Sequence, residues 1–311
     1  MNIENYKPND EAAIIALFDH AFGKPMAPSY WKWRFLDNPR KITSIKLMWH
    51  EEQLVGHYAV SPVMLDINDE PVLTGLSMTT MTHPAFAGLG IFQQLSEALY
   101  KEMQGEQGMA AVWGFPNVNS HRGFIKNLDW KDIALLPMLS CTTSGIAPKT
   151  AANIRKITAF TEMHEQAHAA IFADCPVKVR KDKEYLTWRY FLNPVNKYIV
   201  YDINDGADGF VVVKQFSVPG GAQLDIIDWC VAKDERLTKS VLQHLAAEFP
   251  AEKFNQFNIW MPLKDERHLF FEKIGFNNAL PLTYFGIRSF AMPGLDIDRN
   301  WWIQLGDSDV Y

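Results

Sequence analysis

The residues best suited to chemistry lie in a glycine-containing segment, residues 82–95, which reads THPAFAGLGIFQQL. A strand-like run ends at Pro84, and an amphipathic helix is predicted from Ile91. Gly88 and Gly90 would let the backbone approach a ligand without interference from a Cβ atom. A helix that begins behind such a loop points backbone N–H groups and the positive end of its dipole at one place. The segment predicts an anion site, although two glycines can also serve only to make a turn.

A second pattern with chemical potential is HEQAH, in which His164 and His168 flank Glu165. The segment is predicted to be helical behind Thr161, so both histidines would share one face and could bind zinc, with Glu165 as the base of a metallopeptidase. No third histidine follows at the extended spacing, although Glu184 could serve as a distant third ligand. A zinc peptidase is the least favoured of the functions considered.

An internal repeat organises the elements that must position these residues. Residues 30–39 read YWKWRFLDNP and residues 185–194 read YLTWRYFLNP, with Tyr, Trp, Arg, Asn and Pro at the same spacing. Matches of this kind that include the rare Trp indicate two copies of one fold. The motif itself is expected to serve packing, through a buried Trp and a helix stopped by proline. The repeat also explains the HEQAH helix as the counterpart of the helix at 10–21.

Each half is predicted to be a mixed α/β unit with the same order of elements. The first half is expected to contain helices at 10–21, 91–103 and 120–128 and strands at 44–49, 55–62, 73–82, 109–115 and 133–140. The second half is expected to contain helices at 162–172, 238–248 and 266–274 and strands at 198–203, 209–216, 223–231, 256–261 and 281–288. We therefore expect two domains, 1–147 and 148–311.

The glycine segment and the residues after it resemble the GNAT acetyltransferases. The GNAT loop pattern, Arg/Gln-x-x-Gly-x-Gly/Ala, falls on Ala87–Phe92, and VWGFPNVNSHRGFIKNLDW at 112–130 is similar to the family's next strand, Asn-bearing turn and short helix. The resemblance covers most of the chain and implies a tandem GNAT-like acyl-CoA N-acyltransferase fold. It implies that acetyl-CoA is a co-substrate, bound by residues of the strand end, the loop and the turn: Met81, Thr82, His83, Ala87, Gly88, Leu89, Gly90, Ile91, Phe92 and Asn119. The matching segment of the second half, VAKDERLT at 231–238, has no glycine and two acids that would repel phosphate, so this copy is expected not to bind the cofactor.

Departures from the family pattern bear on catalysis. Ala87 replaces the usual Arg or Gln of the loop, and Ile125 stands where many GNAT enzymes carry a Tyr that protonates the leaving thiolate. Ser120 or a water would then have to supply that proton. His83 is a candidate base, and His57 is the other histidine near this region in the sequence. In some tandem enzymes the end of the chain reaches the active site, so Asp307, Asp309 and the terminal carboxylate are further candidates, with a frayed acidic tail as the alternative.

Composition limits the partners and the location. A net charge of −6 argues against a nucleic-acid partner, and the basic run at 178–183 is expected to be a solvated linker. No apolar run approaches the length that spans a bilayer, no signal peptide is recognised, and three widely spaced cysteines fit reduced thiols. A cytoplasmic monomer or homodimer with no metal and no membrane partner is expected. The predicted function is acetyl transfer from acetyl-CoA to a primary amine of a small molecule or amino sugar; the alternative is a non-catalytic module that binds acyl-CoA.

Overall fold

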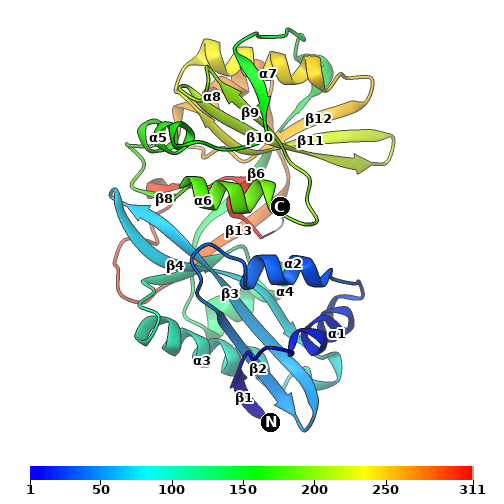
Figure 1. Cartoon of the computed structure of the whole chain (residues 1–311), viewed down its shortest axis with the longest axis vertical. Helices are drawn as coiled ribbons and strands as arrows, with labels where there is room; N and C mark the ends of the chain where they lie inside the picture. Colours follow the sequence, from blue (N-terminus) through cyan, green and yellow to red (C-terminus); the bar gives the residue numbers. More distant parts are fainter. Residues whose placement is uncertain (310–311) are drawn as a thin grey trace. The chain divides into compact units, whose positions relative to one another are not determined.

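One order of helices and strands occurs twice in the structure, a computed structural model that describes residues 1–309 (Figure 1). The chain divides into two compact units. Unit 1 contains Met1–Ala134, Asn193–Val195 and Tyr284–Asp298, and unit 2 contains Leu135–Leu192, Asn196–Thr283 and the chain from Arg299 onward. The predicted mixed α/β fold in two tandem copies is confirmed. The domain boundary expected at residue 147 stays a prediction, because each unit contains segments from both halves of the chain.

Unit 1 is built on a mixed sheet in the order β1-β2-β3-β4-β5-β13. Neighbouring strands are antiparallel except β4 and β5, which are parallel. The strands are β1 (Asn2–Asn5), β2 (Ser44–His50), β3 (Gln53–Ile67), β4 (Glu70–Thr82), β5 (Ala111–Gly114) and the second part of β13 (Asn277–Ser289). The helices are α1 (Glu11–Phe22), α2 (Pro28–Phe35), the 3₁₀ turn η1 (Pro84–Phe86), α3 (Ile91–Gly105) and α4 (Val118–Asn127).

The two faces of this sheet carry separate cores. One face packs against α1 and α2 through a cluster that includes Ile14, Trp31 and Met81. The other packs against α3 and α4 through a cluster that includes Leu95, Tyr100 and Phe124. Figure 1 shows α1 and α2 in dark blue and α3 in teal on opposite sides of the blue strands. This is the layered arrangement expected when a half-buried sheet covers both of its apolar faces with helices.

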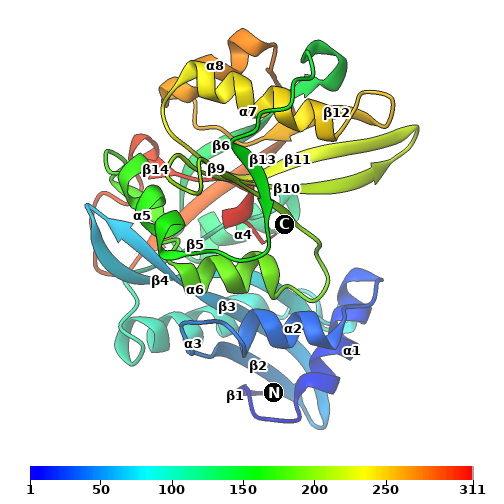
Figure 2. The ribbon, with the colours of Figure 1, turned by 45° about the horizontal axis from the view of Figure 1, so that its top comes forward.

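Unit 2 repeats the sheet in the order β7-β9-β10-β11-β12-β6, with β11 and β12 as its parallel pair. Its strands are β6 (Lys131–Thr142), β7 (Ile154–Ile157), β9 (Ile199–Ile203), β10 (Gly209–Val218), β11 (Gly221–Val231) and β12 (Phe254–Ile259), and β8 (Val177–Val179) pairs with β14 (Trp301–Trp302) beside it. Its helices are α5 (Glu162–Ile171), α6 (Lys183–Leu186), the π-helix η3 (Thr187–Phe191), α7 (Glu235–Glu248) and α8 (Glu266–Ile274). It also has the 3₁₀ turns η2 (Thr143–Gly145) and η5 (Leu305–Asp307), and the turn η4 (Asp298–Asn300) lies where the chain enters it. Figure 2 shows β10 and β11 as a long hairpin, with α7 and α8 together over the unit 2 sheet.

The last strand of each copy lies in the sheet of the other unit. Gly286–Ser289 of β13 pair with Ala111–Gly114 of β5 in unit 1, and Leu139–Thr142 of β6 pair with Gln256–Ile259 of β12 in unit 2. The sequence predicted both strands, but their use to close their own halves was wrong. The reason is physical: alternation of apolar residues shows that a strand exists and says nothing about which edge it joins.

The repeated WR…NP motif has the packing role expected of it. The side chains of Trp33 and Trp188 are both buried. The amide oxygen of Asn38 accepts the N–H of Arg40 at 2.9 Å, and Asn193 accepts the N–H of Val195 at 3.0 Å. The Asn side chain therefore makes the same turn around the proline in both copies, which explains the shared spacing.

The basic run at 178–183 is not a solvated linker, and that expectation was wrong. Lys178 lies in β8, and both Lys178 and Lys181 are buried. Lys181 Nζ lies 2.7 Å from Asp228 Oδ2 and 3.1 Å from Asp307 Oδ1. Burial alone would lower the pKa of Lys181, but these two carboxylates outweigh it and hold the pKa above its usual value. Composition could not show this, because the partners lie far away in the sequence.

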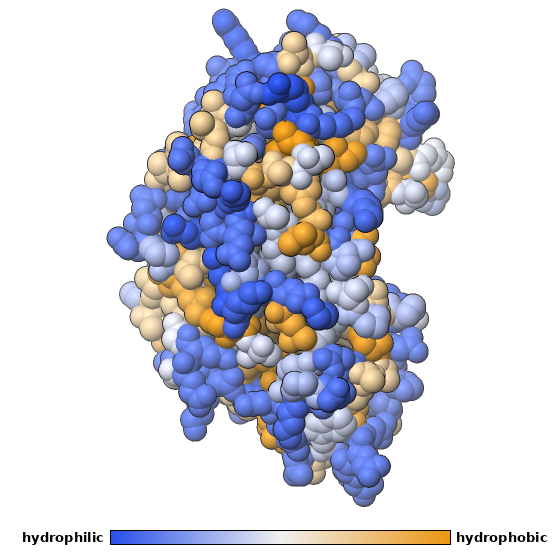
Figure 3. Space-filling model, in the orientation of Figure 1, coloured by the Kyte–Doolittle hydropathy of each residue, from blue (hydrophilic) through white to orange (hydrophobic). Residues whose placement is uncertain are grey.

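Polar and charged side chains, blue in Figure 3, cover most of the face that this view presents. Scattered apolar residues among them are normal for a folded surface. Within residues 1–309, no helix has both the length and the apolar character that a bilayer crossing requires.

Candidate functional site

The site predicted from the glycine segment lies where β4 and β5 part in unit 1. The two parallel strands pair only where Gly75 and Leu76 face Val112 and Trp113. Strand β5 then ends at Gly114, whereas β4 continues to Thr82 with β3 on its other side. The end of β4 therefore has one edge without a strand partner among residues 1–309. The backbone N–H and C=O groups on this edge can hydrogen-bond to an extended group that lies alongside, as a further strand would.

A β-bulge at the end of β4 determines which backbone groups face the open edge. The register with β3 shifts between Met78 and Met81, and Thr79 within the bulge has a φ of +51°. The ring of His57, on β3, donates from Nδ1 to the carbonyl oxygen of Thr79 at 2.8 Å. This bond ties the bulge to β3, because a residue with positive φ needs its surroundings to hold it in place.

Beyond the bulge, Thr82 presents its backbone to the open edge. The N–H of His83 donates to the carbonyl of Val55 on β3 at 2.9 Å. Hydrogen-bonded positions alternate along an antiparallel pair, so His83 and Met81 point their backbone groups at β3 and Thr82 points its own the other way. Of the predicted strand residues Met81, Thr82 and His83, Thr82 is the one placed to donate to a ligand.

His57 is completely buried, and the structure gives it a structural role. Burial lowers the pKa of His57 to about 4, although its bond to Thr79 opposes this shift. Its Nε2 atom has no hydrogen-bond partner among residues 1–309, as expected of a neutral ring in an apolar place. His57 is therefore a neutral donor that holds the bulge.

Acidification should destabilise the protein partly through His57. The folded-state pKa lies below the ordinary value of 6.5, so the stability it contributes is complete above pH 6.5 and is lost as the pH falls to about 4. The loss amounts to about 3 kcal/mol. We expect H57Q to flatten this part of the decline in unfolding free energy, measured by denaturant titration between pH 7 and 4. H20Q, which changes an exposed histidine, should keep the decline of the parent protein; an equal decline in H57Q would contradict the assignment.

The start of α3 forms the second wall of the site. Gly90 precedes the helix with a φ of +73° and provides no side-chain cap, and Gly88, with a φ of +81°, has open space where a Cβ would stand. No acceptor among residues 1–309 takes the backbone N–H groups of Ile91, Phe92 and Gln93. Three free donors at the positive end of a 15-residue helix are an arrangement suited to an anion, and we call this helix start, Gly88–Gln93, the cradle. The anion site itself stays a prediction.

Phe92 belongs to the packing beneath this cradle. Its ring lies 5.0 Å from that of Phe124 on α4, edge to face, and a Cβ on Gly123 would lie 3.1 Å from it. The aromatic residue therefore joins the start of α3 to the second half of α4, and Gly123 leaves room for it. Phe92 contributes its backbone N–H to the cradle and its side chain to the core.

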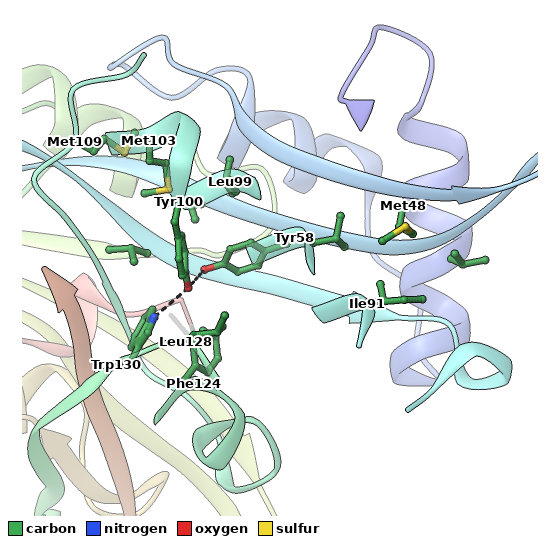
Figure 4. Packing of buried hydrophobic residues seen from close by; sticks show 14 residues of the cluster. Met48, Tyr58, Ile91, Leu99, Tyr100, Met103, Met109, Phe124, Leu128 and Trp130 are labelled. Atoms are coloured by element: carbon green, nitrogen blue, oxygen red, sulfur yellow. Dashed lines mark hydrogen bonds between the residues drawn. The ribbon is translucent and has the colours of Figure 1, made fainter. Parts of the chain in front are cut away.

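A hydrogen-bonded chain in the core fixes α3 against β3 and the end of α4 (Figure 4). The hydroxyl of Tyr100 on α3 lies 2.9 Å from that of Tyr58 on β3, and Trp130 Nε1 donates to Tyr100 at 3.0 Å. Tyr58 also lies 2.9 Å from Ser77 Oγ on β4. Trp130, the last residue of the GNAT-like segment 112–130, thus supports the helix that carries the cradle.

His83 stands at the strand end but is engaged in the turn. Its Nδ1 accepts the N–H of Ala85 at 3.2 Å, and its ring lies against those of His20 and Phe86. A neutral histidine whose Nδ1 accepts carries its proton on Nε2. In this arrangement neither ring nitrogen can take a proton unless the bond to Ala85 breaks.

The Asn-bearing turn at the start of α4 is capped by Asn117. Its side chain accepts the N–H groups of Asn119 and Ser120, at 2.9 and 3.1 Å. Asn119 is exposed, and Ser120 Oγ makes only long contacts with Asn117, at 3.3 and 3.4 Å. Asn117 therefore organises the turn that carries both predicted residues, whose roles toward a ligand stay predictions.

The structure also brings together a histidine and a carboxylate that the sequence analysis missed. His121 Nε2 lies 2.7 Å from Asp132 Oδ1, and the imidazole stacks on Tyr284, with ring centroids 3.9 Å apart. An ionised carboxylate can only accept, so the proton of a neutral His121 is on Nε2 and Nδ1 keeps a free lone pair. Nδ1 makes no hydrogen bond within residues 1–309. The sequence shows no motif that links these residues, because Tyr284 belongs to β13 and lies far from His121 along the chain.

Residues 2–132 match the model of a family described as acetyltransferase (GNAT) domain. This segment is a GNAT domain. The chain as a whole has the fold of two solved structures, a GCN5-related N-acetyltransferase from Anabaena variabilis ATCC 29413 (TM-score 0.74, 13% identity, 93% of this chain and 72% of that one) and another from Kribbella flavida (TM-score 0.69, 12% identity, 93% and 70%). No curated protein matches the sequence. The resemblance seen in the loop is therefore confirmed, and a GNAT domain implies an acyl-CoA co-substrate.

The cradle of the GNAT domain fits such a co-substrate without the usual Arg or Gln. Ala87 makes only the turn bond to Pro84, at 3.2 Å, and is exposed. Without a side-chain donor at Ala87, a phosphate here would have to be bound by the backbone donors of α3. Gly88 and Gly90 adopt the positive φ that this loop conformation requires.

The corresponding helix of unit 2 lacks such a cradle. Helix α7 is capped by Asp234, whose side chain accepts the N–H of Leu237 at 2.8 Å, and Glu235 lies in the first turn. A carboxylate thus takes one of the first-turn donors whose counterparts α3 of the GNAT domain leaves free, and its charge opposes a phosphate.

The HEQAH helix has structural contacts in unit 2. His164 Nδ1 accepts the N–H of Thr161 at 3.0 Å in a capping box, and Glu165 accepts the N–H of Lys183 at 3.1 Å. His168 is buried, and burial, reinforced by nearby Lys181, Lys178 and Arg267, lowers its pKa. In residues 1–309 no group of three or more His, Cys, Asp or Glu side chains is arranged to hold a metal ion.

Proposed function

We propose that the GNAT domain binds acetyl-CoA and transfers its acetyl group to a primary amine of a small molecule or amino sugar. Two groups of backbone atoms without a partner among residues 1–309 carry this proposal. They are the N–H groups in the first turn of α3 and the backbone of Thr82 at the open edge of β4. The cradle at Gly88–Gln93 would hold the pyrophosphate, and the bound co-substrate would supply an activated acyl thioester. Thr82 would hydrogen-bond along the open edge of β4, because its backbone points there.

His121 is the base of this proposal. An incoming ammonium must lose a proton before its nitrogen can attack, and Nδ1 of His121 has the free lone pair that this step needs. Asp132 positions the ring and would stabilise the imidazolium that forms, while Tyr284 fixes its plane. Ser120, or a water beside it, remains the candidate that returns a proton to the thiolate.

Replacing His121 should slow the acyl-transfer step selectively. We expect H121Q to lower kcat by about 10²- to 10³-fold and to remove the ascending limb of the pH–rate profile, with KM for acetyl-CoA little changed. D132N should lower kcat less, because it leaves the ring in place with a weaker partner. H83Q is the matched control and should keep the parent profile. A parent-like profile in H121Q would exclude His121 as the base.

An acceptor screen with detection of free thiol tests the function itself. Amines, amino sugars and blank reactions are compared in the presence of acetyl-CoA, and a thermal shift with acetyl-CoA reports binding separately. Thiol release that depends on one amine class supports the proposal and names the acceptor. Stabilisation by acetyl-CoA without thiol release would instead favour the non-catalytic module, and no stabilisation would count against both.

A further inference from the structure

The C-terminal segment Trp301–Ser308 is an integral part of unit 2. All eight of its residues are buried, so the alternative of a frayed acidic tail is wrong for Gly306–Ser308. The terminal carboxylate lies outside the described residues. Asp307 accepts the N–H of Gln304 at 2.9 Å and pairs with Lys181, so it is committed to contacts within unit 2.

Gln304 hydrogen-bonds along the edge of β11 as a peptide group would. Its Oε1 accepts the N–H of Trp229, and its Nε2 donates to the carbonyl oxygen of the same residue at 3.5 Å. Strand β11 pairs with β12 only as far as Ile226. The side-chain amide of Gln304 therefore continues the ladder at the place where β12 has left it.

Trp229 occupies the position in unit 2 that Thr82 occupies in unit 1. The register of β11 with β10 shifts between Ile226 and Asp228, as that of β4 shifts between Met78 and Met81. Trp229 is the second residue beyond this shift, and Thr82 is the second residue beyond the shift in β4. Both point their backbone groups away from the hairpin partner, toward the edge that the parallel neighbour has left.

Side chains from two elements hold the segment at this edge. Arg189 Nε donates to the carbonyl of Gly306 at 3.1 Å, and Lys181 pairs with Asp307. Gly306 allows the approach: a Cβ there would lie 2.2 Å from the hydroxyl of Tyr190 and 3.1 Å from the carbonyl oxygen of Ile227. The Tyr190 hydroxyl cannot yield easily, because it donates to buried Asp228 at 2.8 Å.

We infer that the C-terminal segment permanently occupies the acyl-CoA site of the second copy, with the amide of Gln304 in the place of an amide of the co-substrate's pantetheine arm. Unit 2 thus has a binding edge of the same kind as unit 1, and its ligand is a peptide segment of the same chain. Two features of unit 2 agree with this inference. Helix α7 is capped by its own Asp234, and the backbone N–H and C=O of Trp229 are already bonded to Gln304. The chain then binds one acyl-CoA, a consequence that rests on the function proposed for unit 1.

Hydrogen exchange at Trp229 tests this occupancy without any ligand. We expect G306A to displace the segment and to raise the exchange rate of the Trp229 amide by on the order of tenfold or more, while the amides of Leu224–Ile226 keep their protection. In Y190F/G306A the blocking hydroxyl is gone, so protection of Trp229 should return; Y190F alone is the matched control. Unchanged exchange at Trp229 in G306A would overturn the inference.

Titration with acetyl-CoA separates this inference from the function of unit 1. The full chain should bind one equivalent, and G88D should bind that equivalent with an affinity about 10- to 100-fold weaker, as expected of a damaged cradle. Two equivalents in the parent protein, or one equivalent bound by G88D with the parent affinity, would show that unit 2 is open and would overturn the inference. No binding by the parent protein would instead refute the proposed function, and the exchange experiment would still decide whether the segment fills the edge of β11.

Discussion

Gly88→Asp should weaken acetyl-CoA binding by about 10- to 100-fold and leave the fold intact, because it places a negative charge beside the cradle. The backbone at Gly88 has a φ of +81°, which Asp and Asn tolerate better than other residues with a Cβ. A Cβ at this position meets no atom within 4 Å, so the substitution causes no clash. Isothermal titration of acetyl-CoA measures the loss.

Gly88→Asn is the control that isolates charge from shape. It has nearly the same size and the same tolerance of positive φ, and it carries no charge. We expect its affinity to fall by less than about threefold, with an unfolding midpoint equal to that of G88D. Equal losses in the two variants would mean that the loop does not face a phosphate, and the cradle would have to be assigned elsewhere.

Lys181→Met should produce the largest loss of stability among single substitutions in the basic run. The substitution leaves Asp228 and Asp307 buried together without their shared cation. Breaking a buried pair in this way costs about 3–5 kcal/mol of unfolding free energy. Burial and the proximity of Asp228 already raise the pKa of Asp307 against the pull of Lys181, so removal of Lys181 should raise it further.

Lys183→Met provides the comparison, because Lys183 pairs with Glu162 at 2.7 Å on the surface. An exposed pair of this kind contributes less than about 1 kcal/mol. Urea unfolding of the two variants should therefore separate them clearly. Replacing both carboxylates by amides, in K181M/D228N/D307N, should recover part of the loss. Similar midpoints for K181M and K183M would contradict the buried charge cluster.

The sequence predicted the features that depend on neighbours along the chain. Gly88 and Gly90 between a strand and a helix indicated a helix start with free N–H groups, because such groups follow from local geometry. The paired motifs around Trp33 and Trp188 revealed the duplication. Helix α8 was predicted at its observed bounds, Glu266–Ile274.

Features that depend on contacts between distant segments of the chain were not predicted from the sequence. His121 and Asp132 come from a helix and the following strand, and the aromatic ring beneath His121 comes from residue 284. Lys181 looked like a surface lysine, since nothing in a short basic run shows that two carboxylates far along the chain will bury it. The role of Gln304 depends on a strand edge 75 residues earlier. Local pattern does not encode such pairings.

The exchange of last strands sets the order in which the protein can be completed during translation. A nascent chain that ends at residue 147 contains β5 but not its partner from β13, so β5 would present a bare edge. Unit 1 acquires this strand only when residues 284–298 leave the ribosome. We therefore expect a fragment cut after the first copy to aggregate, and co-expression of the remaining residues to rescue it.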